Sequence, residues 1–447
     1  MQGAPTEVFR PYGSRDLEAL LSRSSLSASY RLQARAVAEV LPFRANSYVV
    51  DELIDWSAVP DDPMFRLTFP QPEMLPDGDR QAVAGLLAGS APRSQVQGVV
   101  RGIRARLNPH PSGQRERNVP VVDGRAVPGI QHKYRETVLF FPRRGQTCHA
   151  YCTYCFRWAQ FVGDADLRFA GEVEPVVRYL ASRPEVSDVL LTGGDPLVMS
   201  ARMLAGYVEP LLAEPLAHVS MLRIGTKALS YWPYRFVSDP DAGELLALFR
   251  RVVAAGRRLV VMAHYSHPRE LGTGIAVEAV RRVLETGASV RVQAPLIRGV
   301  NDEAALWQEL WSSAVRLDMV PYYMFVERDT GPQDHFAVPL GRAWEIYRDA
   351  YARVSGLART VRGPVMSADE GKVCVDGVLG AGEERAFVLR YLQAREPSWV
   401  GRPFLARFDP AATWWSQLRP VAGADQLQSV AGGGEFDPFA VTSGAGR

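Results

Sequence analysis

Between residues 133 and 354, short apolar segments alternate with amphipathic ones, and this alternation limits the folds that the chain can adopt. Apolar runs at residues 136–141, 188–191, 219–225, 259–264, 290–297 and 320–326 predict six buried strands. The segments at 201–213, 243–255, 275–285, 303–315 and 342–354 have the apolar spacing of helices that pack on a sheet. Fully apolar strands that alternate with helices predict an α/β fold with a parallel sheet.

Six β/α units are too few to close an eight-stranded barrel, so residues 131–360 are predicted to form a partial, open (β/α)6 TIM-like barrel. Residues 1–130 are predicted to form a helical extension, with helices in 17–40 and 79–107. Residues 361–447 are expected to form a C-terminal tail whose tryptophans pack on the barrel or on a partner subunit, with the last dozen residues disordered. The active site of such a barrel lies at the carboxyl ends of its strands.

Charge and cysteine usage exclude several classes of protein. The net charge of +2 gives no sign of a nucleic-acid or membrane surface. The chain has no apolar run long enough to span a membrane and no signal peptide, which favours a cytoplasmic protein. Three of its four cysteines lie within eight residues, which favours metal ligation over a disulfide framework.

The three cysteines, Cys148, Cys152 and Cys155, follow the first predicted strand. Thiolates are the usual ligands of Fe–S clusters, and a complete cubane shell needs four of them. Because the fourth cysteine, Cys374, is far away in the sequence, the spacing predicts a [4Fe–4S] cluster with one open iron, as a catalytic metal site requires. The alternatives are a zinc site that includes His149 and simple packing of three thiols.

The C-x3-C-x2-C spacing resembles the signature of the radical S-adenosylmethionine (SAM) superfamily. The resemblance implies that the open iron chelates SAM and that one electron from the cluster cleaves it. The resulting 5′-deoxyadenosyl radical would abstract a hydrogen atom from the substrate. Tyr154 occupies the aromatic position that packs near the adenine in that superfamily.

From about residue 63 to residue 377, the chain resembles the lysine 2,3-aminomutase family. The resemblance is carried by the segments 127–134, 192–196, 223–226, 264–267 and 296–302 and by Gln293. It implies that the glycine-rich turn meets the SAM amino group and that further polar residues lie around SAM: Gly193, Gly194, Asp195, Arg223, His264 and Gln293. For His264 and His267, a role as polar core residues is the alternative.

Two further matches concern the substrate. Arg157 matches an arginine that holds the substrate carboxylate, and Asp302 matches one of two aspartates that bind the distal amine of lysine. The alternatives are a surface arginine and a helix N-cap before 303–315.

The resemblance fails where the family carries a glycine-rich run that ends in a lysine bound to pyridoxal phosphate (PLP) as a Schiff base. Much of that run has no counterpart in residues 355–372. Lys372, expected just outside the sixth β/α unit, is the only one of three lysines that could anchor PLP. Without the PLP π-system an amine shift lacks its usual route, so the sequence favours PLP-independent hydrogen abstraction that ends in dehydrogenation, epimerisation, elimination or rearrangement. A PLP-dependent 2,3-aminomutase and a non-catalytic Fe–S or zinc scaffold are the alternatives.

The same resemblance implies two partners. One is a small, amino-acid-like substrate that bears a carboxylate, and the other is an electron donor of the flavodoxin or ferredoxin type. Association into a homo-oligomer is left open.

Overall fold

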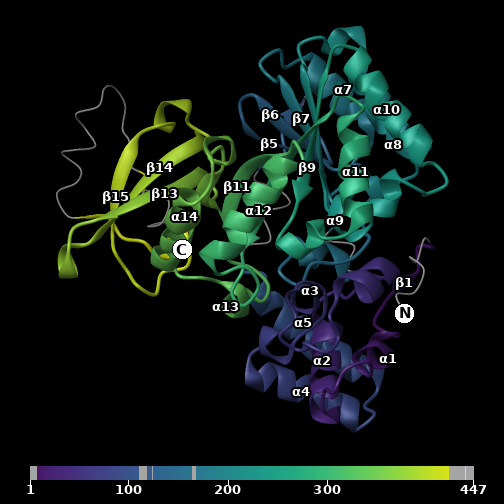
Figure 1. Cartoon of the computed structure of the whole chain (residues 1–447), viewed down its shortest axis with the longest axis vertical. Helices are drawn as coiled ribbons and strands as arrows, with labels where there is room; N and C mark the ends of the chain where they lie inside the picture. The colour runs from purple at the N-terminus through teal and green to yellow at the C-terminus, as the bar shows by residue number, and fades with distance from the viewer. Residues whose placement is uncertain (1–7, 110–117, 123, 164–167, 422–437, 439–447) are drawn as a thin grey trace.

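A single twisted sheet organises the computed structural model, which describes residues 8–109, 118–122, 124–163, 168–421 and 438 (Figure 1). Its eleven strands are ordered β15-β14-β13-β12-β11-β10-β9-β8-β7-β6-β5. The strands of the barrel run parallel: β6 (Thr137–Phe140), β7 (Asp188–Leu191), β8 (Met221–Thr226), β9 (Arg258–His264), β10 (Ser289–Leu296), β11 (Val320–Val326) and β12 (Arg362–Ser367). The first six coincide, within two residues at either end, with the predicted strands, so the α/β prediction is confirmed.

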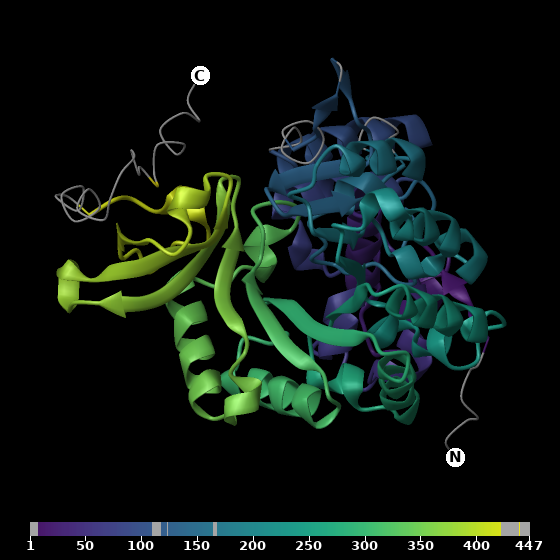
Figure 2. The same cartoon turned by 90° about the horizontal axis from the view of Figure 1, so that it is seen from above.

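Six longer helices connect successive parallel strands: α7 (Val173–Ala181), α8 (Ala201–Val208), α10 (Ala242–Ala254), α11 (Gly274–Leu284), α12 (Ala304–Arg316) and α14 (Leu340–Ala352). Ser200 and Thr273 start two of them, because their hydroxyls accept hydrogen bonds from the N–H groups of Met203 and Ala276. The helices pack their apolar faces on one side of the sheet, and the other side faces the barrel interior (Figure 2). The connectivity is the predicted open (β/α)6 barrel, with β12 as an additional parallel strand.

The N-terminal extension consists of short helices: α1 (Leu17–Leu21), α2 (Ala28–Val40), α3 (Pro63–Thr68), α4 (Asp77–Ala88) and α5 (Arg93–Leu107), with a small ribbon of β1 (Pro11–Tyr12) and β2 (Ala45–Asn46). The two long helices predicted in 17–40 and 79–107 are each divided into two helices in the structure. Ser27 accepts a hydrogen bond from the Tyr30 N–H and starts α2, while Gly89 ends α4 and Pro92 precedes α5. In Figure 1 the extension lies beneath the barrel.

The C-terminal segment is not a tail. Strands β13 (Gly371–Leu379), β14 (Ala386–Ala394) and β15 (Pro403–Arg407) continue the sheet beyond β12 in antiparallel order. Trp399 and Trp415 pack on Tyr391 of β14, with ring centroids 5.5 and 6.4 Å away, so these tryptophans cover the added strands. The predicted disorder of the last dozen residues lies outside the described part of the chain.

At the opposite edge, β5 (Ile130–Tyr134) pairs antiparallel with β6, and a separate ribbon joins β3 (Val121–Val122) and β4 (Arg125–Ala126). The Lys133 ammonium on β5 donates to the carbonyl of Ala368, just after β12. The two sides of the open barrel therefore touch through side chains, with no strand pairing between them in the described part. Within the same residues, no helix is long and apolar enough to cross a membrane.

Candidate active site

The three clustered cysteines lie part-buried on the loop after β6, and the N-terminal extension holds this loop. The Tyr151 N–H donates to the Arg44 carbonyl at 2.8 Å, and the Thr153 N–H donates to the Leu67 carbonyl at 3.0 Å. The Thr153 hydroxyl also donates to the Arg66 carbonyl at 2.7 Å. The loop that carries Cys148, Cys152 and Cys155 is therefore anchored at its middle by backbone from outside the barrel.

The donor set of this loop fits an Fe–S cluster better than a single metal ion. Burial raises the pKa of all three thiols, to about 12 for Cys155, so they need a metal to become thiolates at neutral pH. No three His, Cys, Asp or Glu side chains of the described residues are arranged to hold a single metal ion. A zinc site needs ligands around one centre, whereas cubane thiolates bind separate irons. His149, the other expected zinc ligand, is buried within the loop, and its Nδ1 has no hydrogen-bond partner among the described residues.

The glycines of the predicted SAM-binding turn follow β7 and lie directly against the cysteine loop. Gly193 has φ = +142°, and a Cβ there would lie 2.5 Å from the Gln146 Nε2. A Cβ on Gly194 would overlap the backbone of Thr147, whose carbonyl accepts the Asp195 N–H at 2.7 Å. These glycines therefore have a structural reason to be glycine, and their contact with SAM stays a prediction.

The carboxylate of Asp195 forms its hydrogen bonds with other groups of the protein. It is buried and accepts hydrogen bonds from the Leu197 N–H, the Thr226 hydroxyl and the Lys227 N–H at 2.8–2.9 Å. Burial raises the pKa of Asp195. This side chain joins the ends of β7 and β8.

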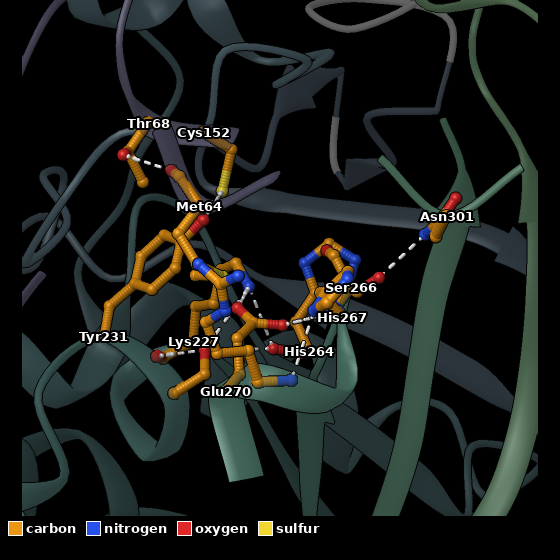
Figure 3. A network of polar contacts seen from close by, with 12 residues as sticks. Met64, Thr68, Cys152, Lys227, Tyr231, His264, Ser266, His267, Glu270 and Asn301 are labelled. Atoms are coloured by element: carbon orange, nitrogen blue, oxygen red, sulfur yellow. Dashed lines mark hydrogen bonds and ion pairs between the residues drawn. The ribbon is translucent and has the colours of Figure 1, made fainter. Parts of the chain in front are cut away.

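A buried network that the sequence did not predict supports Cys152 (Figure 3). Lys227 forms an ion pair with the fully buried Glu270, and its ammonium lies 4.0 Å from the centroid of the Tyr231 ring. The Tyr231 hydroxyl lies 4.0 Å from the Cys152 sulfur. Glu270 also accepts the N–H groups of Ser266 and His267. The sequence did offer one signal for this network. Lys227, one of only three lysines in the chain, follows a parallel strand directly.

Tyr154, His264 and Gln293 come together at the same ends of the strands. The Tyr154 hydroxyl lies 2.7 Å from the Ser266 hydroxyl, and its ring meets the His264 ring edge-on at 6.0 Å. His264 and Gln293 are register partners on β9 and β10. Burial lowers the pKa of His264 to about 3, so its imidazole is neutral. His267 accepts the Arg269 N–H and starts the 3-10 turn Pro268–Leu271, which is a structural role.

Arg223 and Asp302 are predicted site residues whose surroundings differ from those of Tyr154, His264 and Gln293. The Arg223 guanidinium makes a bidentate ion pair with Asp188 at the start of β7, at 2.6 and 2.8 Å. Asp302 precedes Glu303, the N-cap of α12, so it is not the expected cap. Its neighbour Asn301, by contrast, is buried and donates to the carbonyls of Ser266 and Pro295. Asn301 therefore clamps the ends of β9 and β10.

Arg157 lies just after the cysteine loop and is part-buried among aromatic rings. Its guanidinium lies 4.2 Å from the centroid of the Phe141 ring and 5.1 Å from that of Phe156. Burial, together with nearby Arg328, lowers the pKa of Arg157 to about 10. In the described part of the chain it has no ion-pair partner, so it is not an ordinary surface arginine.

Lys372 faces the barrel interior, which corrects the expectation that it lies just outside the sixth unit. Its ammonium donates to the Gln393 side chain at 2.7 Å and lies 4.8 Å from the centroid of the Tyr323 ring. Burial and the nearby guanidinium groups of Arg223 and Arg362 lower the pKa of Lys372 to about 7. A substantial fraction of this amine is therefore unprotonated at neutral pH.

Comparison with known proteins finds relatives along most of the chain. A "Putative L-lysine 2,3-aminomutase" of Aquifex aeolicus (strain VF5) is 31% identical over 402 residues, which cover 90% of this chain and 94% of the relative. The L-lysine 2,3-aminomutase of Fusobacterium nucleatum is 29% identical over 233 residues, which cover 52% of this chain and 51% of the relative. No protein-family model matches.

Among solved structures, a radical SAM methyltransferase from Sphaerobacter thermophilus aligns with a TM-score of 0.37 and 18% identity, over 65% of this chain and 93% of that one. This overlap is too low to support an argument about the site.

Proposed function

Since the chain belongs to the L-lysine 2,3-aminomutase family of radical SAM enzymes, we propose that it removes a hydrogen atom from an amino-acid-like substrate. Cys148, Cys152 and Cys155 would hold the [4Fe–4S] cluster, which supplies the electron that cleaves SAM. The observation that carries the proposal is the loop itself: three part-buried thiols held at the strand ends, with Cys374 on β13. Tyr154, His264, Gln293 and the backbone of residues 193–195 surround the position expected for SAM.

Arg157 is the proposed site for the substrate carboxylate. Its guanidinium has no carboxylate partner in the described part of the chain, and it follows Cys155 by two residues. The planar fork of a guanidinium matches a carboxylate in two hydrogen bonds. The rings of Phe141 and Phe156 fix the orientation of the Arg157 guanidinium.

The test compares two activities of the reconstituted, reduced enzyme. Arg157→Lys should weaken substrate binding by about 1.5–3 kcal/mol while unproductive SAM cleavage changes little, because only the bidentate contact is lost. Arg143→Lys, which alters an exposed ion pair with Glu172 before the cysteine loop, is the control. Equal loss of both activities in Arg157→Lys would place Arg157 at the cluster or in the fold instead.

Two versions of the chemistry differ in whether PLP takes part. The version without PLP rests on the short segment 368–371 before Lys372, which holds no glycine-rich run that could bind a phosphate. The ammonium of Lys372 is also already bonded to Gln393. Hydrogen abstraction would then lead to a product other than a shifted amine.

The PLP-dependent aminomutase is the second candidate, and the position of Lys372 favours it. An amine that binds PLP must be unprotonated and inside the barrel, and Lys372 meets both conditions. Lys133 and the unpartnered hydroxyl of Tyr134 are the groups near it that a phosphate could use. Bound there, PLP would supply the π-system through which nitrogen can migrate.

Borohydride reduction of the purified protein incubated with PLP separates the two versions. The version without PLP expects no stoichiometric adduct and no effect of PLP on turnover. The aminomutase version expects one adduct per chain at Lys372, located by peptide mass spectrometry and absent from Lys372→Met. Arg183→Gln, which removes a guanidinium stacked on Tyr179 outside the barrel, is the control.

A further inference from the structure

The hydroxyl group of Tyr231 is directed at one of the three clustered cysteines. Tyr231 ends the short helix α9 (Ala228–Tyr231) and is 1% exposed, so its hydroxyl group lies away from bulk water. Among the residues that the structure describes, the hydrogen-bond partner of this hydroxyl group is the Cys152 sulfur, at the long distance of 4.0 Å (Figure 3). Buried hydroxyl groups in folded proteins have a hydrogen-bond partner, and here the partner is an expected ligand of the cluster.

The backbone of Tyr231 is tied to the same loop that carries Cys152. The Asn46 side-chain amide donates to the Tyr231 carbonyl at 2.9 Å and to the His149 carbonyl at 3.2 Å. The Tyr231 N–H donates to the Lys227 carbonyl at 2.8 Å. These contacts set the separation between α9 and the cysteine loop, and with it the position of the Tyr231 hydroxyl group relative to the sulfur.

The Lys227 ammonium lies over the face of the Tyr231 ring, 4.0 Å from its centroid. Its three donor hydrogens have partners within the protein, because it donates to the Ser230 hydroxyl at 3.3 Å, the His264 carbonyl at 3.2 Å and the Glu270 carboxylate. The ammonium is therefore held in place and is not free to bind a ligand. A positive charge on the ring face, where water screens it weakly, withdraws electron density and makes the phenol a stronger donor.

Iron binding determines which of the two groups donates. A cysteine binds iron as the thiolate, so the Cys152 sulfur of the loaded protein carries no hydrogen and can only accept. A phenol is a donor at neutral pH, so the proton of this contact belongs to Tyr231. Tyr154 also interacts with Cys152, but its hydroxyl group lies 2.7 Å from the Ser266 hydroxyl and shares its hydrogen bonding with that group.

We propose that Tyr231 donates a hydrogen bond to the cluster-bound Cys152 sulfur and thereby raises the reduction potential of the [4Fe–4S] cluster. Reduction adds one negative charge, part of which the thiolate sulfurs carry, so a hydrogen-bond donor at a sulfur favours the reduced state. Tyr231 is then a positioning residue, which acts on SAM cleavage through the cluster. The inference rests on the proposed function and adds a residue that tunes its first electron transfer.

A redox titration of the anaerobically reconstituted protein tests this role without measuring turnover. Tyr231→Phe removes the hydroxyl group and keeps the ring beneath Lys227. At a fixed potential, electron paramagnetic resonance of the reduced cluster should give a ratio of reduced to oxidised cluster about fivefold below that of the wild type, as for loss of one ordinary hydrogen bond. For one electron, this ratio corresponds to a midpoint about 40 mV lower.

Tyr265→Phe is the matched control. Tyr265 is also fully buried, and its hydroxyl group has no hydrogen-bond partner among the described residues. This variant should keep the potential of the wild type. A second replacement of Tyr231, by 3-fluorotyrosine, keeps the size of the ring and strengthens the donor, because fluorine withdraws electron density. It should raise the ratio of reduced to oxidised cluster above that of the wild type.

The outcomes separate this inference from the proposed function. An unchanged potential in Tyr231→Phe with normal iron content rejects the role of Tyr231 and leaves the proposed function intact. An equal fall in Tyr265→Phe would assign the effect to packing and overturn the inference too. If Tyr231→Phe loses its iron, the 3-fluorotyrosine protein decides, since a potential that does not rise rejects the hydrogen bond. A wild-type protein that binds no cluster rejects both proposals.

Discussion

At the scale of single residues, side chains of one type have different chemistry because their surroundings differ. Cys148, Cys152 and Cys155 share one part-buried loop, whereas Cys374 is buried with Tyr323 and Val365. The lysines divide in the same way. Lys227 is neutralised by Glu270, while Lys372 is hydrogen-bonded to the neutral Gln393 amide and lies near the guanidinium groups of Arg223 and Arg362. The surroundings, rather than the residue type, indicate which of these groups can act on a ligand.

The first prediction concerns the four cysteines. Replacing Cys148, Cys152 or Cys155 with alanine should each abolish SAM cleavage and lower the iron and sulfide content of anaerobically reconstituted protein, because each thiolate holds one iron. Cys374→Ala should keep the cluster and lose about 1–2 kcal/mol of stability through a small cavity. Iron analysis and denaturant unfolding measure both effects. A cluster that survives without Cys152 but disappears without Cys374 would contradict the assignment.

The second prediction concerns the pH dependence of stability. The pKa of Lys372 falls from 10.5 to about 7 on folding, so between these pH values the unfolded chain binds more protons than the folded one. The contribution of Lys372 to the free energy of unfolding therefore rises from pH 7 toward pH 10. Lys372→Met should flatten the measured curve in this window and stabilise the protein at pH 7.

Lys133→Met should flatten the same curve, because the pKa of Lys133 is also lowered to about 7. Denaturant unfolding at pH 7, 8 and 9 gives the comparison. Parallel curves for the wild type and Lys372→Met would show that Lys372 is not buried as described.

At the scale of elements, the cysteine loop is held between two neighbours. The turn after β7 contacts residues 146–147, and the strand β2 and helix α3 of the extension contact residues 149–153. Because the loop itself has no regular structure, these contacts determine where its three thiols lie. A change in either neighbour should therefore affect the cluster without touching a cysteine.

The third prediction uses Gly194 to test this dependence. Gly194→Ala would place a Cβ within 2.5 Å of the Thr147 nitrogen, so the turn or the loop must move. We expect loss of cluster content and at least about 2 kcal/mol of stability, as for other steric clashes in a packed region. Gly206→Ala in α8, where a Cβ meets nothing within 4 Å, should be neutral or stabilising. If Gly194→Ala kept its normal iron content, the turn after β7 would not determine the position of the cysteine loop.

At the scale of the whole molecule, the N-terminal extension packs in one apolar cluster with the cysteine loop and with loops of the barrel, beside the separate core of the barrel. Side chains of α2 and α3 pack in the same cluster as Tyr154 and Trp158 of the cysteine loop. Asn46 connects them further, because its amide donates to the carbonyls of His149 and Tyr231 at 3.2 and 2.9 Å. The extension therefore forms part of the wall of the site.

The fourth prediction tests this connection through Asn46. Asn46→Ala would leave both carbonyls and the Val49 N–H without partners, at a cost of about 3 kcal/mol. Cluster occupancy should fall as well, because the loop and α9 (Ala228–Tyr231) lose their common anchor. Gln33→Ala, which removes an exposed hydrogen bond to Ser29, is the control. Differential scanning calorimetry and iron analysis measure the two effects.

Local patterns in the sequence were sufficient for the parallel strands and for the cysteine loop. Strands β6 to β11 are short apolar-rich runs, and helices between them have apolar spacing on one face, so each element could be identified from its own residues. The antiparallel order of β13 and β14 was not predicted, because no helix separates these strands and the β/α alternation ends before them.

The sequence by itself determined which residues could bind a metal and that the fold is α/β, because spacing and periodicity are properties of neighbouring residues. Only the tertiary structure decided what surrounds each charge. Arg328 joins Arg157 across the Phe156 ring from a strand more than 160 residues later, and Lys372 meets Tyr323 from the C-terminal segment. Burial and electrostatic interactions depend on distances in space, which the order of residues does not contain.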